Sequence, residues 1–445
     1  MELSEEQLKA FNLFKEGKNL FITGPGGTGK SALINTLVNY STLNNLKLQV
    51  CAMTGCAALL LNCNASTLHS WAGIGIAKGN IDDITQKVIK NRFKVKNWLQ
   101  TNILIIDEVS MLSKKLLLLL DNIAKRAKKR PFTPFGGMQI IFCGDFYQLP
   151  PVGNNEDPDS NEFCFNTPLW NTLFKNENII QLNKIFRQDD QIYIKALCQI
   201  REGILTKSSY NALLSCVKKE LNLQDNMKPT ILLPTKSKVN KINFKYLNDL
   251  NSESFIIKSL KVVDDFSTLS TDDKNIRLQL TASDIDFEHD YLINNCMCEN
   301  ELELKIGAQV MCIINLDMEG STKICNGSQG IIIGFDKGLP KVKFTNGDIR
   351  VITYHTWYSE RLPGIGIKQV PLILAWALTI HKAQGATLEY AEIDAGSSIF
   401  ECGQVYVALS RVKSLNGLSL TSFDPQKIKV HKKVKDFYNS INCDE

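Results

Sequence analysis

Residues 24–31 read Gly24-Pro-Gly-Gly-Thr-Gly-Lys30-Ser31, which fits the pattern G-x-x-x-x-G-K-[ST]. The apolar stretch 20–23 before this run predicts a strand, and residues 31–39 predict a helix after it. A strand, a glycine-rich loop and a helix in this order direct several backbone N–H groups at one anion. We therefore expect a phosphate-binding loop rather than a glycine-rich surface turn. Lys30 would reach the β- and γ-phosphates of a nucleotide, and Ser31 would hold Mg²⁺.

The first half of the chain alternates predicted helices and strands. A helix is expected over 5–15, and apolar or β-rich runs predict strands at 20–23, 48–53, 103–106 and 139–143. This alternation indicates a parallel sheet with helices on both faces. Ligands of such sheets lie at the carboxyl ends of the strands, where the phosphate loop is expected.

The second half combines two textures. Runs 230–234 and 371–374 predict strands of a second α/β domain. Between them, from about 302 to 352, short alternating strands are separated by turns, which predicts a small antiparallel barrel inserted in that domain. Residues 251–300 are polar, acidic and poorly periodic, and their pattern assigns no structure. The turns are Cys325-Asn326-Gly327, Asp336-Lys337-Gly338 and Thr345-Asn346-Gly347-Asp348.

The composition is that of an ordinary globular protein, with 44% hydrophobic and 22% charged residues in 445. A net charge of +5 is weak evidence for a polyanionic partner, and the basic clusters at 125–130 and 427–435 fit a solvated face as well as a binding site. The leucine run 116–120 is too short to cross a bilayer, so no membrane partner is expected.

Cysteine usage and the N-terminus indicate a compartment. Thirteen cysteines and an acidic start without a signal or transit peptide favour reduced thiols. We therefore expect an intracellular, soluble protein of the cytoplasm or nucleus, possibly from a virus or a bacterium.

Polar residues follow two more of the predicted strands. Asp107 and Glu108 end the run 103–106, and beside a phosphate loop the first carboxylate is placed to hold Mg²⁺ and the second to polarise the attacking water. Gln148, in the turn after 139–143, is placed to sense a γ-phosphate, although an ordinary loop glutamine is the alternative. These residues favour hydrolysis over binding alone, with ATP and Mg²⁺ as the expected cofactors.

Several motifs occur in a fixed order between about residues 4 and 420. Together they resemble the Pif ("petite integration frequency") family of superfamily 1B DNA helicases, related to the RecD-like helicases. The phosphate loop alone would not be diagnostic, whereas the runs at 135–152, 182–190 and 378–389 are. The motifs are GPGGTGKS (24–31), STLHSWAGI (66–74), LIIDEVSML (104–112), FGGMQIIFCGDFYQLPPV (135–152), LNKIFRQDD (182–190), LTIHKAQGATLE (378–389) and VYVALSRV (405–412).

The resemblance implies an α/β fold class. It consists of two RecA-like P-loop domains, with a small all-β Src-homology-3-like barrel inserted in the second. The implied domains are a first RecA-like ATP-binding domain at 1–178 with a wedge element at 72–98, a second RecA-like domain at 179–300 and 371–430, the barrel at 301–370, and a basic tail at 431–445.

The resemblance also implies roles by motif position. Gln7 would read the adenine edge, and Arg187 and Arg411 would be two arginine fingers from the second domain. The implied catalytic residues are Lys30, Asp107, Glu108, Gln148, Arg187 and Arg411; the nucleotide-binding residues are Gln7, Gly24, Gly26, Gly27, Thr28, Gly29, Lys30 and Ser31; the Mg²⁺ ligands are Ser31 and Asp107; and the DNA-binding residues are Thr54, Gly55, Thr67, His69, Thr379, His381, Lys382 and Gln384.

The implied activity is that of an ATP-dependent helicase. It would translocate 5′ to 3′ on single-stranded DNA as a monomer and unwind duplex DNA in replication, repair, recombination or telomere maintenance. Its partners would be single-stranded DNA and tailed or forked duplexes. Three alternatives stay open: an ATP-gated single-strand-binding switch without processive unwinding, a RecD-like subunit of a nuclease complex, and a preference for RNA.

Three aromatic residues are candidates for stacking on bases. Trp71, Tyr147 and Trp376 lie in or near the motifs, and every base offers a face for stacking. Large aromatic side chains more commonly fill cores, and we expect core packing for each of the three.

Overall fold

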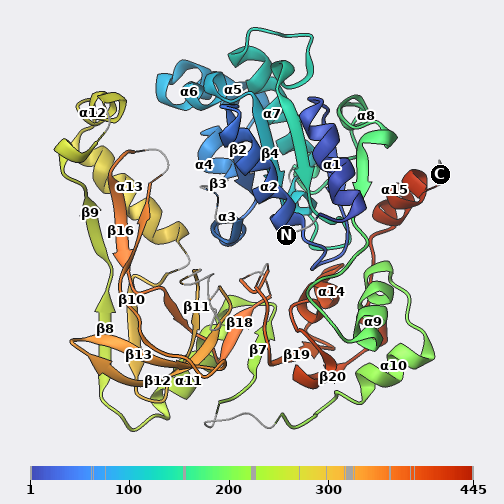
Figure 1. The fold of residues 1–445 in the computed structure, drawn as a ribbon, viewed down its shortest axis with the longest axis vertical. Helices are drawn as coiled ribbons and strands as arrows, with labels where there is room; N and C mark the ends of the chain where they lie inside the picture. The colour runs from blue at the N-terminus through green and yellow to red at the C-terminus, as the bar shows by residue number, and fades with distance from the viewer. Residues whose placement is uncertain are drawn as a thin grey trace. The chain divides into compact units, whose positions relative to one another are not determined.

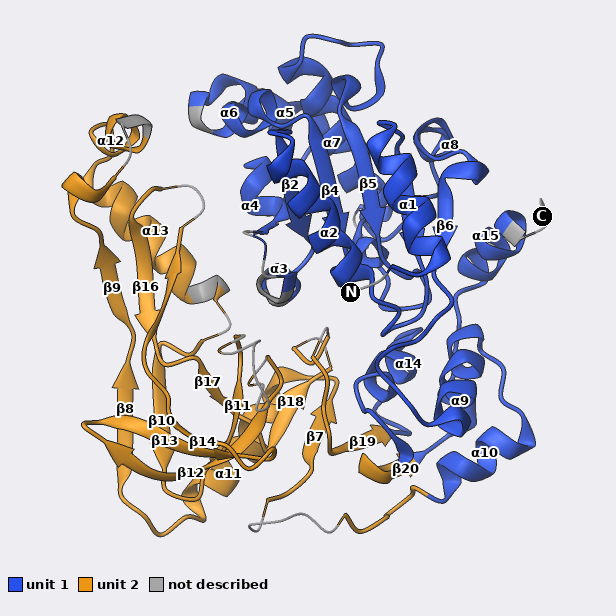
Figure 2. Ribbon diagram, in the orientation of Figure 1, with its two compact units in different colours: residues 1–215, 395–415, 423–445 blue, residues 216–394, 416–422 orange. Residues whose placement is uncertain are grey.

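Contacts divide the chain into two units (Figure 2). The first comprises residues 1–215, 395–415 and 423–445, and the second comprises 216–394 and 416–422. The boundaries expected from the sequence are those of RecA-like domains, which are defined differently from these contact-based units. They stay a prediction. The computed structural model describes residues 3–61, 63, 65–75, 77–153, 157–221, 227–269, 271–296, 298–314, 316, 324, 326–359, 362–380, 382–384 and 386–442.

The first unit contains a six-stranded sheet in the order β3-β2-β4-β5-β1-β6 (Figure 1). Each neighbouring pair of strands is parallel, which confirms the expected sheet type. Four strands were predicted to within one residue at their ends, whereas the short strands β3 and β6 were not predicted. The strands are β1 (Leu20–Thr23), β2 (Leu48–Ala52), β3 (Ser66–Thr67), β4 (Ile103–Asp107), β5 (Gln139–Cys143) and β6 (Ile179–Gln181).

Both faces of this sheet are covered. Because side chains alternate along a strand, Leu104 and Ile106 of β4 join one apolar cluster, and Ile103 and Ile105 join the other. Side chains of α4 to α8 belong to the cluster of Leu104 and Ile106, and side chains of α1 to α3 belong to the cluster of Ile103 and Ile105. These helices are α1 (Glu5–Lys15), α2 (Lys30–Leu43), α3 (Gly55–Leu61), α4 (Leu68–Ala72), α5 (Ile81–Lys90), α6 (Arg92–Gln100), α7 (Lys114–Ala127) and α8 (Pro168–Leu173).

The remaining helices of the first unit come from later in the chain. The segment expected as a basic tail contains α15, whose Val434 and Tyr438 are buried in the same cluster as α4 to α8. No helix in the described part of either unit is long and apolar enough to cross a lipid bilayer. These helices are α9 (Gln191–Glu202), α10 (Lys207–Leu214), α14 (Gln404–Leu409) and α15 (Lys432–Asn442).

The predicted wedge region, 72–98, contains α5 and most of α6, and both helices pack into the apolar cluster that includes Leu104 and Ile106. The rings of Trp71 and Trp98 are 4.5 Å apart, and the Trp98 indole N–H donates to the Ala72 carbonyl at 3.1 Å. Trp71 is 3% exposed, Trp376 5% and Tyr147 8%. Core packing is therefore confirmed for the three aromatic residues that were candidates for base stacking.

The second unit contains a sheet in the order β18-β7-β19-β20, in which β7 pairs in parallel with β18 and β19. The strand predicted at 230–234 is confirmed by β7. The run 371–374 does form a strand, β17, but its expected place in this sheet was wrong, because β17 pairs antiparallel with β11. The strands are β7 (Thr230–Leu233), β17 (Leu372–Leu374), β18 (Ala377–Thr379), β19 (Ala391–Ala395) and β20 (Leu418–Phe423).

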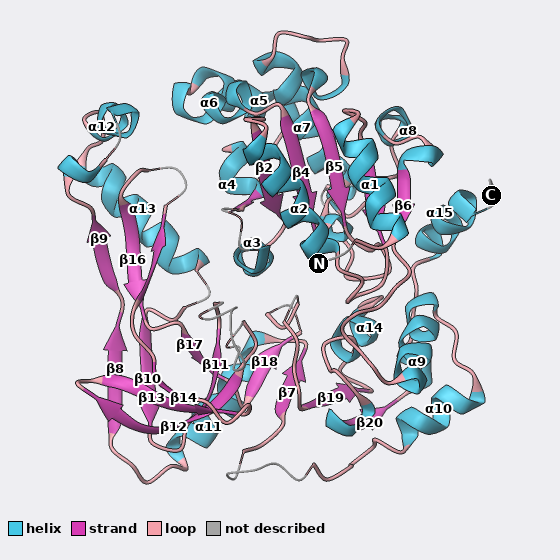
Figure 3. Cartoon of the chain, in the orientation of Figure 1, coloured by secondary structure: helices cyan, strands magenta, loops and turns pink. Residues whose placement is uncertain are grey.

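An antiparallel sheet in the order β14-β13-β12-β11-β17 occupies the hairpin-rich segment (Figure 3). The turn predicted at 336–338 joins β12 and β13, and Lys337 and Gly338 have φ values of +50° and +80°. The turn at 345–348 joins β13 and β14, whereas Cys325 of the third predicted turn lies outside the described residues. The strands are β11 (Gln309–Cys312), β12 (Gln329–Asp336), β13 (Leu339–Phe344) and β14 (Ile349–Val351).

Residues 251–300, which the sequence left unassigned, contain strands and helices. Strand β8 pairs with β10, and β9 joins β15 and β16 in a three-stranded antiparallel sheet. Closure of the strands between 301 and 370 into a Src-homology-3-like barrel stays a prediction. The elements within 251–300 are β8 (Ser254–Lys258), β9 (Leu260–Val263), α12 (Thr271–Arg277) and α13 (Ala282–Asn295). The neighbouring elements are α11 (Lys236–Asn248), β10 (Glu301–Lys305), β15 (His355–Tyr358) and β16 (Ile365–Gln369).

The fully buried Trp98 provides a test of this packing. Trp98→Ala should lower the free energy of unfolding by about 3–5 kcal/mol, because it leaves a cavity beside Trp71 and removes the bond to Ala72. Urea denaturation followed by near-ultraviolet circular dichroism measures the loss. Phe132→Ala is the control, since Phe132 is 97% exposed and its loss should change stability by less than about 0.5 kcal/mol. Equal effects of the two substitutions would contradict the packing.

Candidate nucleotide-binding site

The phosphate loop connects the carboxyl end of β1 to the first turn of α2. Gly24, Gly27 and Gly29 have φ values of +145°, +88° and +80°. A side chain is also sterically excluded at Gly27, because an added Cβ would lie 2.6 Å from the Cβ of Arg187. Glycine therefore permits both the curl of the loop and the close approach of Arg187, as a backbone anion site requires.

Lys30 lies at the start of α2 and folds back over the loop. Its Nζ donates to the Gly24 carbonyl at 2.6 Å and to the Pro25 carbonyl at 2.9 Å. Burial lowers the pKa of Lys30, and the charges of Asp145, Glu108 and Asp107 oppose that shift. The ammonium group is therefore held at the mouth of the loop.

Two carboxylates follow β4 at the same edge of the sheet. Asp107 is its last residue, and its Oδ1 accepts the backbone N–H of Glu108 at 2.9 Å. Glu108 has a left-handed backbone with φ of +57°, which is uncommon outside glycine. Burial, and then the neighbouring Glu108 charge, raise the pKa of Asp107 to about 7. A divalent cation would stabilise the ionised form, so the buried carboxylate fits a Mg²⁺ site.

Both predicted arginine fingers approach the loop. A Cβ built on Gly26 would lie 3.5 Å from Arg187 Nη1, Arg411 Nη2 and Ser410 Oγ alike. The two arginines also belong to the same contact unit as Lys30, although the sequence assigned them to the second domain. The geometry therefore brings two guanidinium groups to one point beside the phosphate loop.

The two guanidinium groups are charged but poorly compensated. Burial lowers the pKa of both, and the like charge of Arg411 adds to the shift of Arg187 to about 9. Their acceptors in the described chain are the Ser410 and Val407 carbonyls and the Ser410 hydroxyl, with no carboxylate among them. Such a pair is suited to an incoming anion.

Two neighbouring side chains, Gln188 and Tyr193, hold the segment around Arg411 in place. Gln188 Nε2 donates to the Ser410 and Val412 carbonyls at 3.2 and 3.1 Å. The Tyr193 hydroxyl donates to the Leu409 carbonyl at 2.7 Å. The segment around Arg187 and the end of α14 are thus fixed to each other by buried hydrogen bonds. Sequence reasoning assigned no role to Gln188, although it lies beside Arg187 in a diagnostic motif.

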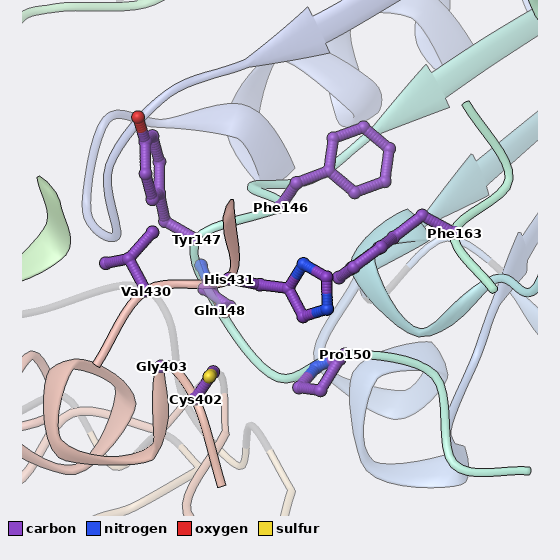
Figure 4. Close-up of a pocket in the computed structure, with 9 residues that line it drawn as sticks. All are labelled: Phe146, Tyr147, Gln148, Pro150, Phe163, Cys402, Gly403, Val430 and His431. Carbon is purple, nitrogen blue, oxygen red and sulfur yellow. The ribbon is translucent and has the colours of Figure 1, made fainter. Parts of the chain in front are cut away.

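Gln148 lies in the buried turn after β5. It is 5% exposed, and its Oε1 has no partner among the described residues. It lines a small pocket together with Pro150, Cys402, Gly403 and His431 (Figure 4). A buried acceptor without a bond is costly, so the site fits a further polar group near Gln148. Its role as γ-phosphate sensor stays a prediction.

Gln7 supports the loop from α1. It takes part in a capping box with Ser4, and its Nε2 lies 3.4 Å from the Thr28 and Gly29 carbonyls. Ser31, the predicted metal ligand, is exposed at the second position of α2. These contacts do not test whether Gln7 reads the adenine edge, so that role stays a prediction.

Tyr406 is a site residue that the sequence did not reveal. The Gly26 N–H donates to its hydroxyl oxygen at 2.8 Å, and burial raises the pKa of this phenol. Backbone N–H groups of such loops are the usual donors to phosphate. Its position in the motif 405–412 was the only available signal.

The DNA-binding candidates of the first unit lie at neighbouring strand ends. Thr67 ends β3 opposite Ala52 of β2, and Thr54 lies two residues beyond Ala52. Both threonines cap helices, since their hydroxyls accept the N–H groups of Ala57 at 3.2 Å and Ser70 at 3.4 Å. Gly55 begins α3, and His69 lies in α4.

The candidates of the second unit follow β18. Thr379 ends this strand, and its hydroxyl accepts the Lys382 N–H at 3.1 Å. Gln384 is 2% exposed, and neither of its amide atoms has a partner in the described part of the chain. His381 lies outside the described residues. Contacts of all these residues with DNA stay predictions.

The fold and the strand–loop–helix at residues 20–43 define a RecA-like protein with a phosphate-loop sequence. The model described as "PIF1-like helicase" matches residues 2–208, and that of the "DNA helicase Pif1, 2B domain" matches residues 289–335. The chain is 30% identical to the ATP-dependent DNA helicase RRM3 of Saccharomyces cerevisiae, over 99% of this chain and 68% of that protein. The chain therefore belongs to the PIF1-like helicase family.

Further relatives support the same family membership. The chain is 34% identical to the human ATP-dependent DNA helicase PIF1, over 99% of this chain, and spans 64% of that protein's length. Pif1 helicase from Candida albicans has a TM-score of 0.76 at 32% identity, with 99% of this chain and 100% of that chain covered. Pif1 from Bacteroides sp in complex with ADP-AlF4 has a TM-score of 0.78 at 26% identity, covering 100% and 98%. These likenesses confirm the α/β fold with RecA-like domains.

The half-buried His69 gives the first unit a predictable acid response. Burial lowers the pKa of His69, so just below about pH 6.5 the unfolded chain binds more protons than the folded chain. Stability should therefore fall as the pH falls through this window. In His69→Gln without nucleotide or DNA, urea denaturation should show a smaller loss between about pH 7 and 5. Equal losses of unfolding free energy in the two proteins over this pH range would contradict a lowered pKa of His69.

Proposed function

We propose that this chain is an ATP-dependent 5′-to-3′ DNA helicase. It would translocate on single-stranded DNA and unwind duplex DNA in replication, repair, recombination or telomere maintenance. The observation that carries the proposal is the approach of Arg187 and Arg411 to Gly26, because two guanidinium groups beside a phosphate loop suit hydrolysis of a triphosphate. Family membership supports the same activity.

The residues of the site fit ATP with Mg²⁺. Lys30 and the loop N–H groups would bind the phosphates, and Ser31 and Asp107 would hold the metal, as the buried Asp107 carboxylate favours. Bound Mg²⁺ neutralises phosphate charge in phosphoryl transfer. Glu108 orients the attacking water and accepts its proton, while Gln148 contacts the γ-phosphate.

Arg187 and Arg411 stabilise the charge that develops on the transferred group. An arginine finger contributes about 10³–10⁵ in rate in related reactions. Their mutual repulsion is relieved while phosphate lies between them and returns when it leaves. This difference can couple nucleotide occupancy to movement of the RecA-like domains, and so to stepping along DNA.

The DNA-binding residues would follow the nucleic-acid backbone without reading its sequence. Threonine hydroxyls, His69, Lys382 and the unpaired amide of Gln384 offer polar contacts of this kind. Solved relatives include Bacteroides Pif1 bound to ssDNA and an assembly described as DNA unwinding at forked dsDNA by two coordinating Pif1 helicases. Both relatives favour DNA as the partner, and the second favours unwinding of forked DNA over a switch that does not unwind.

Polarity of unwinding tests the proposal directly. The protein should separate 5′-tailed duplexes and leave 3′-tailed duplexes intact in an ATP-dependent strand-displacement assay. Lys30→Ala should abolish ATPase and unwinding but keep measurable binding to single-stranded DNA, because Lys30 contacts phosphate and not DNA.

Three results would contradict it. Unwinding from 3′ tails would reverse the polarity, and full unwinding by Lys30→Ala would remove the loop from the mechanism. DNA-stimulated ATP hydrolysis without any strand separation would favour the switch. The same assay with RNA oligonucleotides decides between DNA and RNA.

A further inference from the structure

A buried ion pair lies beneath the Gln148 turn. Arg201 of α9 donates through Nε and Nη2 to both carboxylate oxygens of Asp145, each at 2.9 Å. Asp145 is fully buried and Arg201 is 8% exposed. Asp145 Oδ1 also accepts the backbone N–H of Tyr147 at 3.2 Å. This pair is bidentate and hydrogen-bonded, so it fixes the start of the turn in one orientation.

The hydroxyl of Tyr438, on helix α15, joins this pair to the end of β1 and to the turn after β5. It accepts the Phe146 N–H at 3.2 Å, lies 2.6 Å from the Thr23 hydroxyl and donates to Asp145 Oδ1 at 3.4 Å. A phenol has one proton and two lone pairs. Either hydroxyl can be the donor in the short bond between Tyr438 and Thr23, and the Tyr438 oxygen contacts three polar partners.

These partners place Tyr438 between two parts of the nucleotide site. Thr23 ends β1 directly before Gly24 of the phosphate loop, and Phe146 lies two residues before Gln148. The turn is confined on another side by Gly403, where an added Cβ would lie 2.5 Å from the Tyr147 and Gln148 carbonyl oxygens. Gly403 precedes α14, and Arg411 lies two residues beyond the end of that helix.

Aromatic contacts hold Tyr438 in this position. Its ring stacks on Tyr147 with centroids 4.6 Å apart and an angle of 9°. The Arg201 guanidinium lies over both rings, at 4.4 Å from Tyr147 and 5.3 Å from Tyr438. The next side chain back along α15, Phe437, stacks on Phe165 at 4.3 Å. These ring contacts fix the helix, and they hold the Tyr438 hydroxyl between the end of β1 and the turn after β5.

We propose that Tyr438 is a positioning residue for the nucleotide site. Its hydroxyl, with the Asp145–Arg201 pair, sets the spacing between the phosphate loop and the turn that carries Gln148. The C-terminal helix is then part of the ATPase machinery without touching the nucleotide. This inference rests on the proposed function, since the spacing matters for turnover only if a γ-phosphate lies against that turn.

Tyr438→Phe tests the hydroxyl while keeping the ring stack. It should lower the ATPase kcat about ten- to a hundredfold, the range expected for a small misplacement of a reacting group. ADP affinity should stay within about twofold, because ADP lacks the phosphate that Gln148 would contact. Without nucleotide, hydrogen–deuterium exchange should quicken at the Phe146 amide and its neighbours, and not across the rest of the sheet.

Tyr210→Phe is the matched control, because its ring contacts Phe423 and no hydrogen bond of its hydroxyl occurs in the described chain. Phe437→Ala separates loosening of the helix from loss of the hydroxyl. If Tyr438→Phe behaves like Tyr210→Phe in kcat and exchange, the positioning role is wrong. A uniform rise in exchange with a parallel loss of ADP binding would show a general structural role and would also overturn it.

The exchange arm separates this inference from the proposed function. If the unchanged protein hydrolyses no ATP, the helicase proposal fails, yet local exchange at Phe146 still reports whether the Tyr438 hydroxyl fixes the turn. Unaltered exchange in an active enzyme would sink the positioning role and leave the helicase proposal standing.

Discussion

Two positive charges held against a glycine-rich loop are the constraint on which the site depends. Arg187 and Arg411 approach the same point beside Gly26, and burial lowers the pKa of both. Keeping like charges close in a partly dehydrated place opposes folding unless an anion joins them. The surrounding chain provides the rigidity for this arrangement, through the hydrogen bonds of Gln188 and Tyr193 to the carbonyls around Arg411.

The parallel sheet, and not the segments that carry the two arginines, positions the carboxylate of Asp107 and the phosphate loop. In the parallel sheet of the first unit, the carboxyl ends of β1, β4 and β5 lie at one edge and deliver the phosphate loop, Asp107 and the Gln148 turn. Burial raises the pKa of Asp107 and lowers that of Lys30, so both groups are placed where their charged forms cost free energy. Nucleotide phosphate and a divalent cation together would supply the missing counter-charges. The charges of Asp107 and Lys30 therefore suit binding of a nucleotide better than they suit stabilisation of the fold.

Local sequence determined how much could be predicted. Helix α1, the central strands and the glycine-rich connection from β1 to α2 are specified by glycine spacing and by apolar runs, and their predicted positions were correct. Run 371–374 was given the wrong sheet because a short apolar strand has no period that distinguishes a parallel from an antiparallel neighbour. Tyr438 and Arg201 could not be found at all, since they reach Asp145 from segments 293 and 56 residues away. Tyr406 was within a quoted motif, but only the folded chain shows its contact with Gly26.

Thermal denaturation of the Arg187→Gln and Arg411→Gln proteins, with and without a non-hydrolysable ATP analogue and Mg²⁺, tests the central claim most directly. Without nucleotide each variant should be at least as stable as the unchanged protein, because one of two repelling charges is gone. With the analogue the unchanged protein should gain several degrees, and each variant should gain much less. Variants that are destabilised alone and still gain the full increment would show that the two guanidinium groups serve the fold and not the phosphate.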